Sequence, residues 1–107
     1  MAPHRLQDAF PEFAKELEDL LLASKEPNLS AQIPQLLITR RCGCEDDFCA
    51  TFYTKFEPTT RPDDDFRCLE LESEEGMIIL DVSSGRIVTV EVLFRDDVRK
   101  QLRALFP

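Results

Sequence analysis

Four cysteines are the residues of this chain with the most versatile chemistry, and three of them are close together in the sequence. Cys42, Cys44 and Cys49 surround the acidic run Glu45–Asp47, whereas Cys68 follows later. Thiolates bind zinc, attack electrophiles and exchange disulfides. The surrounding segment also contains the only tyrosine and three of the eight phenylalanines. It is therefore the first candidate for a functional site.

A hairpin that turns within the acidic run would place thiols opposite one another. Two registers are open, depending on which two acidic residues form the turn. In one register Cys42 faces Cys49, and in the other Cys44 faces Cys49. Directly opposed β-carbons in antiparallel strands lie about 4.5–5.5 Å apart. The spacing predicts a cluster of two or three thiols at the hairpin tip. Cys68 joins the cluster only if its strand runs alongside.

Three uses of these cysteines are open. Four thiolates from Cys42, Cys44, Cys49 and Cys68 are the right inventory for a zinc site, although zinc knuckles favour wider spacing than C-x-C. Redox or nucleophilic chemistry would need a cation that lowers a thiol pKa, and the acidic run opposes that. The third use, which the sequence favours, is as small buried hydrophobic residues in a reduced protein. No resident cofactor is expected unless zinc is bound.

Charge is the second functional feature of the sequence. The formal net charge is −8, and residues 57–75 contain eight acidic residues against two basic ones, with the run Asp63, Asp64 and Asp65 in their midst. Such a field repels phosphate backbones and attracts a basic partner. We therefore expect no nucleic-acid binding. Arg40, Arg41 and Tyr53 form a second candidate patch for a partner.

The length of 107 residues predicts a single domain over residues 1–107. Apolar periodicity predicts an N-terminal helix from Phe10 to about Ser24 and a C-terminal helix capped by Asp96 or Asp97, each amphipathic. Five strands are expected between them, at residues 35–41, 48–56, 66–72, 77–82 and 87–94. Short connections favour an α+β fold with a five-stranded antiparallel meander sheet. The Phe48–Phe56 strand should turn its phenylalanines inward, and Arg95 should lie on the outer face of the last helix.

Two stretches, RCGCEDDFCATFYT at Arg41–Thr54 and GMIILDVSSGRIVTVEVLFRDDVRKQL at Gly76–Leu102, resemble a pattern of small bacterial α+β proteins of unknown function. They share a CGC-x4-C hairpin and a C-terminal β-hairpin followed by a helix. The resemblance covers about half of the chain. It implies a fold and a bacterial source, and it carries no catalytic residues.

These observations predict a cytoplasmic binding module that is not an enzyme. One form would be an immunity or antitoxin-like inhibitor whose acidic surface, Glu57–Glu75, covers a basic toxin. The alternative is a small zinc-binding or redox protein. The sequence has no apolar run long enough for a membrane span. A homodimer is a further expectation, formed by pairing the first or fifth strand with its copy.

Overall fold

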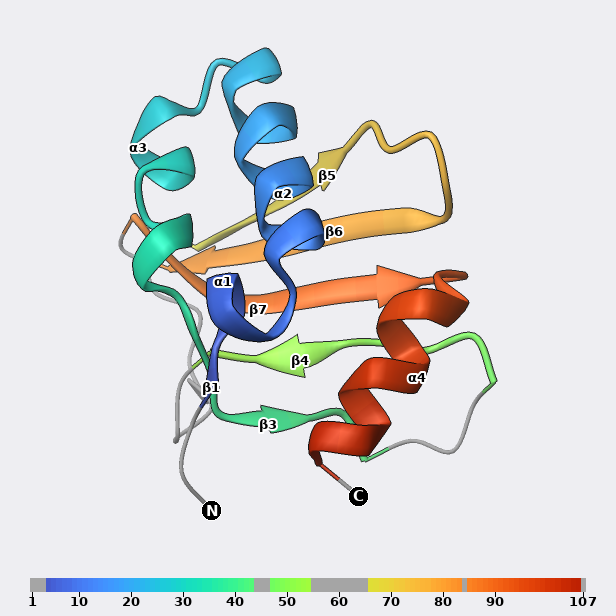
Figure 1. Ribbon diagram of the computed structural model, residues 1–107. Coiled ribbons are helices and arrows are strands. Elements are labelled where there is room, and N and C mark those ends of the chain that lie inside the picture. Colours follow the sequence, from blue (N-terminus) through green and yellow to red (C-terminus); the bar gives the residue numbers. More distant parts are fainter. Residues whose placement is uncertain (1–3, 44–46, 55–65, 84, 107) are drawn as a thin grey trace.

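The computed structural model describes residues 4–43, 47–54, 66–83 and 85–106 of the chain. The fold is α+β, with a five-stranded antiparallel sheet, a two-stranded sheet and four α-helices in these residues. In Figure 1 the helices lie on one face of the larger sheet. The helices are α1 Leu6–Ala9, α2 Pro11–Ala23, α3 Pro27–Ser30 and α4 Asp96–Leu105, with a 3-10 turn at Ile33–Gln35.

The larger sheet has the strand order β3-β4-β7-β6-β5, all antiparallel. Its strands are β3 Arg40–Arg41, β4 Phe52–Tyr53, β5 Arg67–Leu71, β6 Met77–Ser83 and β7 Arg86–Leu93. The five antiparallel strands confirm the predicted fold class, but the predicted meander is wrong. The chain leaves β4, passes to β5 at the far edge, and returns through β6 so that β7 lies next to β4 (Figure 1).

The first predicted strand, residues 35–41, is divided between two sheets. Leu37–Ile38 form β2, which pairs with β1 at His4–Arg5, whereas Arg40–Arg41 form β3 of the larger sheet. The helical prediction was also incomplete, because it did not include α1 at Leu6–Ala9. Pro11 and Pro27 each stand at the start of a helix, where the missing amide hydrogen costs nothing.

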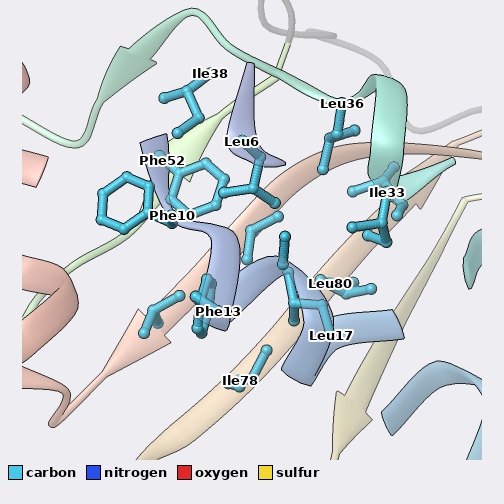
Figure 2. Packing of buried hydrophobic residues seen from close by; sticks show 14 of the residues in the cluster. Leu6, Phe10, Phe13, Leu17, Ile33, Leu36, Ile38, Phe52, Ile78 and Leu80 are labelled. Atoms are coloured by element: carbon cyan, nitrogen blue, oxygen red, sulfur yellow. The ribbon is translucent and has the colours of Figure 1, made fainter. Parts of the chain in front are cut away.

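The core lies between the helices and the covered face of the larger sheet (Figure 2). Helix α2 contributes Phe13, Leu17 and Leu21 at helical spacing, and all three are buried. Strands β6 and β7 alternate buried and half-buried residues, because successive side chains of a strand point to opposite faces. The residues of the opposite sheet face are therefore presented away from the helices.

Phe48 and Arg95 differ from their predicted orientations. Ala50 and Phe52 are buried as expected, but Phe48 is 42% exposed. Phe56 lies outside the described residues. Arg95 was expected on the outer face of the last helix, yet it is only 7% exposed. It is the N-cap residue of α4, and its backbone position turns the side chain beneath the helix towards α2.

Candidate functional site

The register of β3 against β4 decides the arrangement of the cysteines. Arg40 pairs with Tyr53 and Arg41 with Phe52. Cys42 consequently faces Thr51, and its amide donates a hydrogen bond to the Thr51 carbonyl over 2.8 Å. The register in which Cys42 faces Cys49 is therefore wrong. The alternative partner of Cys49, Cys44, lies outside the described residues.

Cys68 lies far from the other described cysteines. It belongs to β5, and three strands separate β5 from β3 at the opposite end of the sheet. Adjacent strands are 4.7–4.9 Å apart, so these edges are separated by about 19 Å. The structure does not bring Cys68 together with Cys42 and Cys49. The predicted zinc site consisted of all four cysteines, and its remaining member, Cys44, lies outside the described residues.

The thiol of Cys68 has its own partner. Its Sγ donates a hydrogen bond to Oδ1 of Asp81 over 3.1 Å, across the β5–β6 pair. This hydrogen bond is the main cause that raises the pKa of Cys68, and the nearby charges of Asp81 and Glu91 add to it. An exposed thiol held in its protonated form is a weak nucleophile.

The predicted patch of Arg40, Arg41 and Tyr53 divides into two parts. The guanidinium of Arg40 lies over the Tyr53 ring, 4.4 Å from its centroid. Burial and the neighbouring Cys42 thiol raise the pKa of Tyr53, although the charge of Arg40 acts in the opposite direction. Arg41 instead donates hydrogen bonds to the carbonyls of Phe106 and Cys42, so it ties the end of α4 to the sheet. The residues Asp63, Asp64 and Asp65 lie outside the described residues.

One concavity of the described structure is an acidic groove of about 860 Å³ between α2 and the segment that joins β5 to β6. Seven carboxylates and two cations line it, which gives a formal charge of −5. The carboxylates come from three parts of the chain: Glu12, Glu16 and Asp19 of α2, Glu72, Glu74 and Glu75 before β6, and Asp97 of α4. We call these residues, with Lys15 and Arg95, the acidic groove.

Arg95 forms the floor of the acidic groove. Its two terminal nitrogens donate to the two carboxylate oxygens of Glu16 over 2.9 and 3.0 Å. The Ser73 hydroxyl donates to the same Glu16 carboxylate over 3.1 Å. Asp97 lies 3.4 Å from Nε of Arg95, and the Phe13 ring lies beneath the guanidinium at 5.5 Å. The charge of Arg95 is thus engaged inside the fold, and the exposed carboxylates dominate the electrostatic field of the groove.

A second, shallower groove of about 680 Å³ adjoins the first one and shares Glu75, Arg95 and Asp97 with it. Phe48 and Phe94 form its apolar part, and Asp47 and Asp96 complete its lining. The Phe48 and Phe94 rings are stacked, with centroids 5.3 Å apart and planes inclined by 26°. Carboxylates and exposed aromatic rings therefore share one continuous surface.

Sequence reasoning found part of this surface. The acidic residues before β6 belong to the predicted acidic stretch, because Glu72, Glu74 and Glu75 fall within residues 57–75. The participation of Glu16 and Arg95 was missed, since 79 positions separate them and no local pattern connects them. Phe48 and Phe94 were missed because strand alternation assigned them to the buried face.

In residues 4–43, 47–54, 66–83 and 85–106, no three histidine, cysteine or acidic side chains are grouped so as to hold a metal ion. Within the same ranges, none of the helices has the length and apolar character needed to cross a membrane. The chain matches no family model, no curated protein and no solved structure.

Proposed function

We propose that this protein is a non-enzymatic binding module that recognises a basic protein partner through the acidic groove. The observation that carries the proposal is the groove itself, in which seven carboxylates from three separate segments face one concavity. Like charges gathered in this way repel one another and disfavour the compact state. A partner that supplies cations would relieve the repulsion between these carboxylates, so the groove is suited to bind a basic surface.

Burial supports the same reading of the groove. Glu12, Glu74 and Glu75 are exposed, so their carboxylates are accessible to a partner. Arg95 is held chiefly by Glu16 within the fold, and of the outer carboxylates it approaches Glu75, at 3.8 Å. Complementary surface charge speeds encounter and selects between partners more than it adds affinity.

The specific form that we favour is an immunity or antitoxin-like inhibitor that acts in the cytoplasm. Such an inhibitor covers a basic active surface, and steered association suits a protein that must bind its target quickly. Glu72, Glu74 and Glu75 are the residues of the acidic stretch predicted at 57–75 that line the groove.

The test is capture of a partner from cells of the source organism, followed by measurement with the purified partner. The triple variant Glu12→Gln, Glu74→Gln and Glu75→Gln removes three carboxylates of the groove. Its matched control, Asp8→Asn, Glu70→Gln and Glu91→Gln, removes the same charge away from the groove. Isothermal titration at low and high salt then compares the three proteins.

We expect the groove variant to bind at least tenfold more weakly at low salt, through a slower association rate, and the control to bind like the wild type. The affinity of the wild type should fall as salt rises. Equal affinities of the groove variant and its control would reject the acidic groove as the recognition surface. Hydrolysis or group transfer by the purified protein, acting on the captured partner, would reject the non-enzymatic part of the proposal.

A further inference from the structure

Phe94 has a backbone conformation that is costly for a residue with a side chain. Its φ angle is 61°, in the left-handed region that glycine adopts freely. The conformation turns the chain from the end of β7 into α4 and directs Arg95 inward, but glycine would allow the same turn. The Phe94 ring is 60% exposed, so burial within the fold returns little of the cost. A role for the ring outside the folded chain would explain its presence.

The second ring of this surface is held firmly beside the first. The Phe94 amide donates a hydrogen bond to the Phe48 carbonyl over 2.8 Å, and the two rings are stacked. Phe48 is 42% exposed. Two adjoining rings with more than a third of their surface exposed form an apolar platform that is organised before any partner arrives.

Carboxylates surround this platform. Asp47, Glu75, Asp96 and Asp97 line the groove that contains both rings, against the single cation of Arg95. Arg95 lies 3.4 Å from Asp97 and 3.8 Å from Glu75 besides its pair with Glu16, and Arg99 lies 3.4 Å from Asp96. The four carboxylates outnumber these two cations, so the formal charge around the rings is negative. The face of an aromatic ring is itself the negative end of a quadrupole. Rings and carboxylates together favour a cationic occupant.

Contacts within the fold show which cation can interact with an aromatic ring and a carboxylate at the same time. The Arg95 guanidinium lies over the Phe13 ring while it donates two hydrogen bonds to Glu16. Arg40 lies over Tyr53 in a similar manner. The planar guanidinium stacks on aromatic faces and meets a carboxylate with two parallel hydrogen bonds, which the lysine ammonium group does not do.

We infer that Phe48 and Phe94, with the surrounding carboxylates Asp47, Glu75, Asp96 and Asp97, form a docking site for an arginine side chain of a basic protein partner. The inference rests on the proposed function and assigns the chemistry of recognition within it. The arginine stacks on the exposed rings and donates hydrogen bonds to the carboxylates. The acidic groove next to it then accommodates further cations of the same partner segment.

The experiment uses two capped synthetic peptides of equal length and charge. One has four arginines separated by Gly-Ser pairs, and the other has lysine at the same four positions. Binding to the full-length protein is followed by the chemical shifts of the phenylalanine ring protons and by titration calorimetry. The variants are Phe94→Gly, which removes the ring and suits the left-handed backbone, and a second triple variant, Glu12→Gln, Asp19→Asn and Glu74→Gln, which removes exposed carboxylates of the acidic groove that do not belong to the docking site.

We expect the arginine peptide to bind the wild type roughly five times more tightly than the lysine peptide. Phe94→Gly should abolish this preference while its thermal unfolding midpoint stays near that of the wild type. The triple variant should weaken both peptides and retain the preference. Equal binding of the two peptides, or an unchanged preference in Phe94→Gly, would overturn the arginine site and leave the acidic groove standing. If the triple variant binds both peptides as the wild type does, the proposed function fails as well.

Discussion

The guanidinium of Arg95 meets the carboxylate of Glu16 in a two-pronged ion pair, with hydrogen bonds of 2.9 and 3.0 Å between α2 and the start of α4. The Arg95 side chain is only 8% exposed and that of Glu16 is 30% exposed. The pair therefore lies largely out of water and joins segments that are 79 positions apart. It fixes the floor of the acidic groove.

Replacement of Arg95 should test this pair directly. Arg95→Ala leaves Glu16 partly buried without its cation and removes the contact with the Phe13 ring, so we expect a loss of about 2–4 kcal/mol of unfolding free energy. Arg95→Lys keeps the charge but not the two parallel hydrogen bonds to Glu16, and should lose about half as much unfolding free energy. Urea unfolding measures both, with the exposed Lys100→Ala as the control. A value for Arg95→Ala within the error of that control would contradict the structural role.

The pH dependence of the unfolding free energy should reveal the lowered pKa of the Asp97 carboxyl. Burial of its carboxyl acts to raise the pKa, but hydrogen bonds from Arg95 and the Val98 amide, with the Arg95 charge, lower it below the usual value. A carboxyl whose pKa is lowered by folding stabilises the fold above its unfolded pKa, near 4. This contribution is lost as the pH falls through the lower pKa of the folded state.

Asp97→Asn is the variant that isolates this effect. The stability difference between the wild type and Asp97→Asn should be constant from pH 7 to pH 5 and should narrow below pH 4. Because the Asp97 side chain is 67% exposed, the difference should stay small. Urea unfolding at pH 7, 5 and 3 measures it, with Asp19→Asn as the control. A difference that widens as the pH falls would contradict the sign of the pKa shift.

Gly76 should be sensitive to the addition of one methyl group. Its φ angle is 65°, and a β-carbon there would overlap the backbone carbonyl oxygen of Leu93. Gly76→Ala should therefore cost about 2–4 kcal/mol and disturb the acidic residues that precede β6. Gly85→Ala is the matched control, since Gly85 has a φ angle of 76° and a β-carbon there would meet no described atom within 4 Å. Equal destabilisation by the two substitutions would show that the close approach to Leu93 is unimportant.

Cys68 should react slowly for an exposed thiol. Its hydrogen bond to Asp81 holds the pKa above the usual value, so little thiolate is present at pH 8. Asp81→Asn should lower the pKa and increase the rate of alkylation by iodoacetamide several-fold, measured at this residue by peptide mass spectrometry. Glu70→Gln removes a neighbouring charge without touching the hydrogen bond and should leave the rate nearly unchanged. Slower alkylation of Asp81→Asn would contradict the assignment.

The strand order shows which of the two strands expected to pair with a second copy lies at an edge of the sheet. The fifth predicted strand became β7, which is paired on both sides by β4 and β6. It therefore has no free edge for a second copy. Of the two strands expected to pair with a copy, β3 is at an end of the described sheet. Dimer formation through this edge stays a prediction, which sedimentation velocity would test.

The sequence by itself determined the features that depend on local physics. Alternation of apolar residues located the strands that became β5, β6 and β7, and the spacing of Phe13, Leu17 and Leu21 located the buried stripe of α2. The acidic stretch likewise identified three of the seven groove carboxylates in advance. These features follow from near neighbours in the chain, so they can be read without knowledge of the fold.

Only the tertiary structure decided which distant segments meet. The strand order, in which β7 lies between β4 and β6, depends on packing free energy that no local pattern encodes. That order separates Cys68 from the other described cysteines and brings Arg95 to Glu16. The left-handed turn at Phe94 then reverses the alternation of β7 at its last step. It exposes the Phe94 ring and buries the arginine that follows, contrary to what period-two alternation predicts.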